Sequence, residues 1–207
     1  LSKSEVLGRL AFCGYEILNE INIADRFYFV CKKNKTVSEE ESPSYGPIVR
    51  LKRIGYKGEP LYIYKLRTMY PYSEFIQGDI YEKYHLDKSG KMKGDYRITS
   101  WGKIFRKYFI DEIPQLYNWI KGDINLVGVR ALSEHYFGLY PPDLQQKRTH
   151  FKPGLIPPYY ADLPKSFDEI IESERNYLKQ KETSPIITDI RYFLKAMSNI
   201  FLGARSK

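Results

Sequence analysis

The spacing of apolar residues at the start of the chain predicts a helix followed by a β-hairpin. Residues 3–13 carry Val, Leu and Ala side chains at the intervals of three and four that mark one face of a helix. Residues 15–20 and 26–33 are two strand-like runs separated by a short loop, as in a hairpin. We therefore expect residues 1–35 to form a small helix-and-hairpin unit that packs against another part of the protein.

The acidic segment 36–47, rich in Ser and Pro, predicts a linker or surface loop. Residues 48–55 and 60–67 then alternate in polarity on either side of a glycine-containing gap, which predicts a second hairpin. The remainder of the main domain, residues 48–207, is dominated by helical patterns. Helices are expected at residues 101–109, 112–120, 141–148, 167–180 and 187–203.

Two shorter segments complete the expected fold. Residues 124–128 are apolar and suit a strand or extended segment, whereas the prolines and glycine of residues 152–160 argue against regular structure. The fold class is expected to be α+β: a mostly helical core that includes one β-hairpin, preceded by the small helix–hairpin unit.

Composition narrows the possible partners without choosing among them. The net charge of +8 favours polyanions such as nucleic acid, anionic lipid headgroups or diphosphate compounds. Aromatic residues make up 15% of the chain, which suits a membrane–water interface as well as base stacking. No apolar run of about 18 residues predicts a spanning helix. The chain begins at Leu1 rather than Met, so we expect that a membrane anchor either precedes it or is replaced by amphipathic helices.

Several common catalytic motifs do not occur in the sequence. Neither glycine-rich phosphate loop is present, and there is no G-x-S-x-G elbow. The three histidines are scattered without metal-ligand spacing. Cys13 and Cys31 are too few for a disulfide framework and are expected to be reduced thiols.

The adjacent carboxylates Asp111 and Glu112 have two interpretations. Asp is a favoured helix N-cap, Glu suits the first turn, and Pro114 is tolerated there, so capping alone accounts for the segment. Alternatively, an Asp can attack a phosphoryl group and form an acyl phosphate. A carboxylate beside it can bind Mg²⁺ together with substrate phosphates. The pair alone leaves both interpretations open.

Three stretches in order resemble the bacterial sugar transferase family, the monotopic phosphoglycosyl transferases. They are "YKLRTM" (64–69), "DYRITSWGKIFRKYFIDEIPQLYNWIKGDINLVGVR" (95–130) and "KPGLIPPYY" (152–160). The second resembles the family's D-x-R-I-T…L-D-E-L-P-Q-L…L-V-G-P-R-P block over its whole length. The resemblance extends over roughly residues 45–203. It departs from the family in lacking a re-entrant N-terminal helix, in reading Val129-Arg130-Ala131 for P-R-P, and in ending on Tyr159 and Tyr160 for the family's W-Q.

The resemblance implies a role for each matching residue. Asp111 would be the nucleophile that attacks the β-phosphate of a UDP-sugar, and Glu112, with Asp111, would hold Mg²⁺. The acid in the following helix would correspond to Glu174. The basic residues expected to meet phosphates or the nucleotide are Lys65, Arg67, Arg97, Arg106 and Arg130.

The resemblance also implies the partners. The expected reaction transfers a sugar phosphate from a UDP-sugar to polyprenol (undecaprenyl) phosphate and initiates exopolysaccharide, capsule or O-antigen synthesis. The expected location is the cytoplasmic face of the bacterial inner membrane, on anionic lipid, with no nucleic-acid partner. Two alternatives are a basic, non-catalytic module that binds lipid or single-stranded nucleic acid, and a nucleotide-sugar binder without turnover. Mg²⁺-dependent UMP release would separate the enzyme from both.

Overall fold

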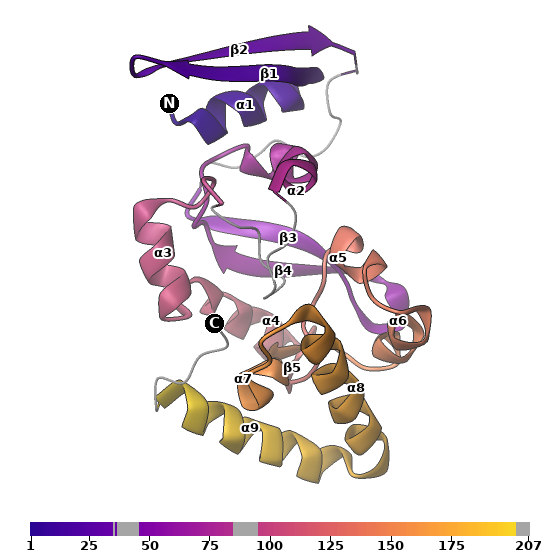
Figure 1. Cartoon of the computed structure of the whole chain (residues 1–207). Helices are drawn as coiled ribbons and strands as arrows, with labels where there is room; N and C mark the ends of the chain where they lie inside the picture. The colour runs from indigo at the N-terminus through magenta and orange to yellow at the C-terminus, as the bar shows by residue number, and fades with distance from the viewer. Residues whose placement is uncertain (35, 37–45, 85–94, 202–207) are drawn as a thin grey trace. The chain divides into compact units, whose positions relative to one another are not determined.

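The computed structural model describes residues 1–34, 36, 46–84 and 95–201, and these form two compact units (Figure 1). The first unit comprises the described parts of Leu1–Val49, Leu66–Asp87 and Met92–Asp111. The second comprises Arg50–Lys65 and the described part of Glu112–Lys207. Helices predominate and the strands occur in small pairs, so the predicted α+β class is confirmed.

The first unit begins with the predicted helix and hairpin. Helix α1 (Lys3–Phe12) starts at Ser2, whose side chain accepts a hydrogen bond from the Glu5 N–H at 3.1 Å. Strands β1 (Tyr15–Ile23) and β2 (Arg26–Lys33) pair antiparallel, and α1 lies along them (Figure 1). The other elements of this unit are η2 (Ser73–Ile76), α2 (Gln77–Tyr84) and α3 (Ser100–Lys107). Its core is made by Leu7, Ile76 and Ile80.

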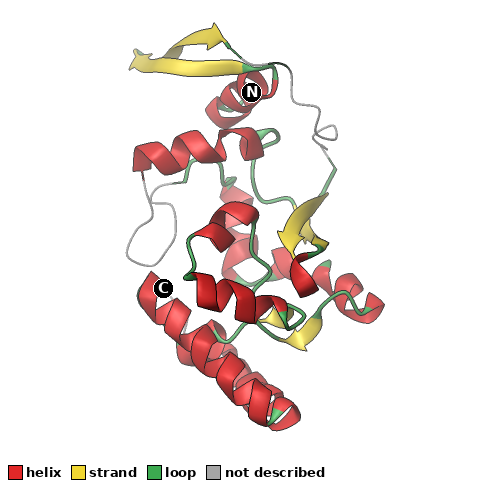
Figure 2. Ribbon diagram, turned by 90° about the vertical axis from the view of Figure 1, so that its right-hand side faces the viewer, coloured by secondary structure: helices red, strands yellow, loops and turns green. Residues whose placement is uncertain are grey.

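The second unit surrounds two short strand pairs with helices, drawn red in Figure 2. Strands β3 (Ile48–Ile54) and β4 (Pro60–Leu66) form the predicted hairpin around the 3₁₀ turn η1 (Tyr56–Gly58). Strands β5 (Asn125–Val127) and β6 (Gly154–Ile156) pair in parallel. The helices of this unit are α4 (Gln115–Lys121), α5 (Glu134–Gly138), α6 (Pro142–Thr149), α7 (Tyr159–Asp162), α8 (Phe167–Thr183) and α9 (Pro185–Phe201).

The core of the second unit lies where α8 and α9 pack on the segments around β5. Tyr177 and Leu178 of α8 are fully buried there, as is Ala196 of α9. The close crossing of β5 and β6 requires two glycines: a Cβ on Gly154 would lie 2.0 Å from the backbone nitrogen of Gly128. This crossing fixes the start of the segment that carries Arg130.

Two predictions about local structure are wrong. The helix expected at 112–120 begins only at Gln115, because residues Ile110–Glu112 form a separate 3₁₀ turn, η3, and Pro114 occupies the N-cap position. Residues 152–160 contain regular structure after all, since β6 finds a backbone partner in β5 and α7 starts at Tyr159. The predicted linker 36–47 lies mostly outside the described residues, and the predicted domain division stays a prediction.

Among the residues that the structure describes, no helix combines the length and the apolar character needed to cross a bilayer.

Candidate active site

The predicted site residues Lys65 and Glu112 meet in the second unit. Lys65 lies near the end of β4 and Glu112 ends the turn η3, and the Lys65 Nζ is 2.5 Å from the Glu112 Oε1. Their side chains are only 15% and 18% exposed, so water screens this charge-assisted hydrogen bond weakly. Two groups that lie 47 residues apart in the chain are thereby held as one ion pair.

A buried asparagine keeps this ion pair in place. Asn118 of α4 is fully buried, and its Oδ1 accepts a hydrogen bond from the Tyr64 N–H at 3.0 Å. Its Nδ2 donates to the Tyr62 carbonyl at 2.8 Å and to the Asp123 carboxylate at 3.1 Å. The Asn118 side chain thus makes the two backbone hydrogen bonds that a neighbouring strand would otherwise make with β4. It thereby fixes Tyr64, the residue before Lys65. Sequence reasoning missed Asn118, although an asparagine within a helix is the signal that could have identified it.

The backbone of Arg130 is held by a buried ion pair between Arg148 and Glu174. The Arg130 carbonyl accepts a hydrogen bond from the Arg148 Nη2 at 2.5 Å. The Arg148 guanidinium also pairs with the carboxylate of Glu174 and lies 4.7 Å from the centroid of the Tyr140 ring. Glu174, which was predicted to bind substrate, is fully buried. In the structure its carboxylate pairs with Arg148, which in turn holds the Arg130 carbonyl.

Two tyrosines share the electrostatic environment of Arg130 and Glu112. The Arg130 guanidinium is 6.0 Å from the centroid of the Tyr159 ring. Burial raises the pKa of Tyr159 despite the opposing effect of Arg130. Burial, followed by the influence of Tyr159 and Glu112, raises the pKa of Tyr160 well above its usual value. Both phenols therefore remain protonated hydrogen-bond donors at neutral pH.

The other predicted basic residues belong to the first unit, where they have local partners. The Arg67 Nε donates to the Gly46 carbonyl at 3.0 Å. Arg97 holds Asp95 through two hydrogen bonds of 2.8 and 2.7 Å. Burial acts to raise the pKa of Asp95, but the hydrogen bonds and charge of Arg97 lower it overall. The Arg106 Nε donates to the Thr68 hydroxyl at 2.9 Å.

The structure gives Asp111 a different place from the one that the capping interpretation expected. Asp111 lies inside the turn η3 and is only 6% exposed. The N-cap position of α4 belongs to Pro114, so Asp111 is not the N-cap residue of that helix. Its role as a nucleophile stays a prediction.

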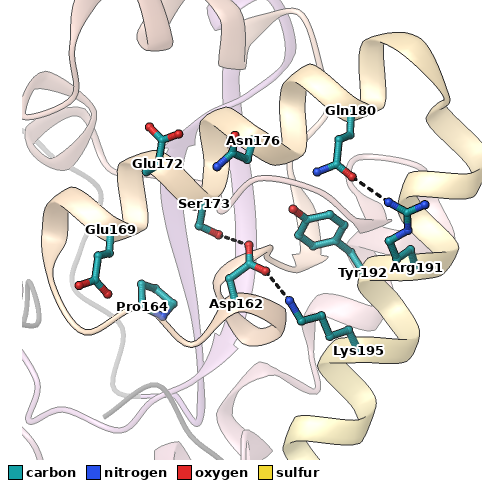
Figure 3. Close-up of a pocket in the computed structure, with 10 residues that line it drawn as sticks. All are labelled: Asp162, Pro164, Glu169, Glu172, Ser173, Asn176, Gln180, Arg191, Tyr192 and Lys195. Carbon is teal, nitrogen blue, oxygen red and sulfur yellow. Dashed lines mark hydrogen bonds and ion pairs between the residues drawn. The ribbon is translucent and has the colours of Figure 1, made fainter.

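A separate polar pocket of about 460 Å³ lies among α7, α8 and α9 (Figure 3). The Asp162 carboxylate in its lining accepts hydrogen bonds from the Ser173 hydroxyl at 2.7 Å and the Lys195 Nζ at 2.9 Å. Burial and the charge of Asp162 raise the pKa of Tyr192 to about 12. These groups mainly satisfy one another across the three helices, and none of the predicted site residues lines the pocket.

Comparison with known proteins identifies the family. A family model described as bacterial sugar transferase matches residues 37–203. The chain therefore belongs to the bacterial sugar transferase family, as the motifs around Asp111 predicted.

Individual relatives show which proteins of this family the chain is similar to. Galactosyl transferase CpsE of Streptococcus agalactiae serotype III (strain NEM316) is 34% identical over 161 residues, which make up 75% of this chain and 34% of that protein. Undecaprenyl-phosphate galactose phosphotransferase of Salmonella typhimurium (strain LT2) is 36% identical over 108 residues, 50% of this chain and 22% of that protein. UDP-N-acetylgalactosamine-undecaprenyl-phosphate N-acetylgalactosaminephosphotransferase of Aeromonas hydrophila is 38% identical over 172 residues, 79% of this chain and 37% of that protein. The chain thus spans well under half the length of each of these relatives.

Proposed function

We propose that this protein transfers a sugar phosphate from a UDP-sugar to polyprenol (undecaprenyl) phosphate and releases UMP. The observation that carries the proposal is the buried Asp111, which lies outside the N-cap position of α4 and adjoins a carboxylate held by Lys65. The names of the relatives support the substrate classes, because they include a UDP-sugar donor and undecaprenyl phosphate. The product would initiate an exopolysaccharide, capsule or O-antigen.

The reaction proceeds in two displacements at the same phosphorus atom. A carboxylate oxygen of Asp111 attacks the β-phosphorus of the UDP-sugar, and the bond to the bridging oxygen breaks with its electron pair leaving on UMP. A phosphate oxygen of the polyprenol phosphate then attacks the sugar-phosphoryl-aspartate, which restores the Asp111 carboxylate. Lys65 and Arg130 supply positive charge for the phosphate oxygens during both steps.

The carboxylates suit a magnesium ion chemically. Mg²⁺ prefers oxygen ligands and binds through one or two carboxylates together with substrate phosphates and water. Glu112 and Asp111 are the residues that would hold it, and the ion would neutralise charge on the diphosphate.

Exposed apolar side chains on two helices support attachment to a membrane surface. In the first unit, Trp101 and Ile104 of α3 are 46% and 56% exposed beside Lys103 and Lys107. In the second unit, one face of α9 exposes four side chains by 55–74%: Ile186, Ile187, Ile190 and Leu194. Apolar faces bordered by basic residues are typical of helices that lie in the interface of anionic membranes. We place the protein on the cytoplasmic face of the inner membrane.

The test uses Asp111→Asn, with Asp168→Asn as the matched control, because Asp168 is exposed in the first turn of α8. With UDP-sugar and Mg²⁺ but no polyprenol phosphate, the wild type should release at most one UMP per enzyme, apart from slow hydrolysis. Its mass should rise by one sugar phosphate, carried on the peptide that contains Asp111. Asp111→Asn should remain folded without forming the adduct, since a neutral amide cannot attack phosphorus. Full activity in Asp111→Asn would disprove the mechanism, and Mg²⁺-independent binding without UMP release would favour a binding module.

A further inference from the structure

Arg53 lies beside the segment that carries Arg130, although the family resemblance drew no attention to it. The last residue of β3, Ile54, donates its N–H to the Leu132 carbonyl at 2.9 Å. This bond ties the end of β3 to the chain two residues beyond Arg130. Arg53 directly precedes Ile54, and the residue is partly buried.

No carboxylate among the described residues pairs with Arg53. Its Nη1 donates to the backbone carbonyl of Lys52 at 2.7 Å. Burial, followed by repulsion from Arg130, lowers the pKa of Arg53 to about 10. A partly buried guanidinium beside another cation costs free energy unless an anion lies next to it.

Arg53 and Arg130 differ in how their charges are compensated. Glu112, which is paired with Lys65, and Tyr159 both act favourably on the charge of Arg130. Burial and Arg130 both act unfavourably on the charge of Arg53. A phosphate group of a bound diphosphate ester would supply the negative charge that Arg53 needs.

We propose that Arg53 is a further substrate-binding residue that grips the diphosphate of the nucleotide sugar together with Arg130. The identity of the anion rests on the proposed function, whereas the anion site itself rests on the arrangement of the two arginines. Guanidinium groups suit this task because their planar fork can donate two parallel hydrogen bonds to phosphate oxygens.

The experiment measures binding by calorimetry for uridine, UMP, UDP and inorganic pyrophosphate. It compares the wild type with Arg53→Gln, Arg53→Lys and the control Lys52→Gln, which removes an exposed charge from the same strand. Hydrogen bonds to charged groups contribute about 1.5–3 kcal/mol, so Arg53→Gln should weaken UDP and pyrophosphate binding about 10- to 100-fold. Uridine binding should not change, Arg53→Lys should be intermediate, and Lys52→Gln should match the wild type.

Each outcome decides the proposal. If folded Arg53→Gln binds UDP and pyrophosphate as tightly as Lys52→Gln does, Arg53 does not contact the anion. If Arg53→Gln does not fold, Arg53→Lys replaces it, and wild-type affinity for both ligands in that variant would overturn the proposal. Loss of pyrophosphate affinity in a chain whose wild type releases no UMP would keep the anion site but refute the sugar transfer. Normal UMP release by the wild type, together with unchanged UDP and pyrophosphate affinities in Arg53→Gln, would keep the sugar transfer but refute the anion site at Arg53.

Discussion

Asn118→Ala should destabilise the protein because it removes three hydrogen bonds from a fully buried side chain. The Tyr64 N–H and the Tyr62 carbonyl both lose their side-chain partner on α4. Leaving a buried polar group unsatisfied costs about 1–3 kcal/mol, so the two backbone groups together should cost roughly 2–6 kcal/mol. The third bond, to Asp123, adds little because that carboxylate is partly exposed and lies 3.5 Å from the Lys121 Nζ.

Urea denaturation and thermal unfolding measure this cost. For a chain of this size 1 kcal/mol corresponds to about 2–4 °C, so the thermal midpoint should fall by at least about 4 °C. UMP release should fall as well, because β4 would no longer hold Lys65 against Glu112. Asn176→Ala is the matched control, since Asn176 is an exposed asparagine on α8 and surface substitutions usually change stability by about 0.5 kcal/mol or less. Equal stability of the two variants would refute the role of Asn118 as a substitute strand.

Arg130→Lys should weaken UDP-sugar use with polyprenol phosphate saturating, because a fork of donors becomes a point charge; unchanged kinetics would make Arg130 structural. Glu174→Gln should lower stability by about 3–5 kcal/mol, because it leaves the buried Arg148 without its counter-charge; a urea midpoint equal to that of the wild type would contradict this. The protein should sediment with anionic vesicles, less so in high salt, and not with neutral ones; equal binding to both kinds would argue against the interfacial helices. Iodoacetamide at pH 8 should modify the exposed Cys13 before Cys31, because burial raises the pKa of Cys31 and leaves less of it as thiolate. If mass spectrometry showed Cys31 modified first, this difference in exposure and pKa would be contradicted.

The elements that depend on local patterns were predictable from the sequence. Both hairpins and the helices α3, α8 and α9 follow from apolar spacing within a single segment, and α6 follows from the prolines at its start. The turn between β1 and β2 was less evident, because Ala24 and Asp25 both adopt positive φ where Asn-Gly is the usual signal. The antiparallel pairing of β1 with β2 forces Ala24 and Asp25 into positive φ, although neither residue type favours that conformation as glycine does.

The parts of the site that depend on distant contacts could not be predicted. The pairing of β6 with β5 joins residues about 29 positions apart, so a segment that is rich in proline gains a strand that its own composition disfavours. The role of Asn118 follows from its hydrogen bonds to β4, and nothing in its immediate sequence reveals these partners. The role proposed for Arg53 rests on the bond that ties the end of β3 to the chain beyond Arg130, which the sequence does not reveal either. The Asp111–Glu112 pair was recognisable only because a long motif surrounds it, since two adjacent carboxylates alone suggested a cap.

The glycine crossing of β5 and β6 has a consequence for how substrate choice could change in this protein. Any side chain at Gly128 or Gly154 would push the two strands apart and displace both chain segments that leave the crossing. One segment leads to Arg130 and the other to Tyr159, so backbone packing sets the spacing between the proposed phosphate contact and the Tyr159 ring. If the proposed function holds, we expect substitutions at Tyr159 to alter which sugar is accepted without moving Arg130. Selection or laboratory evolution could then vary the sugar while Arg130 keeps its place.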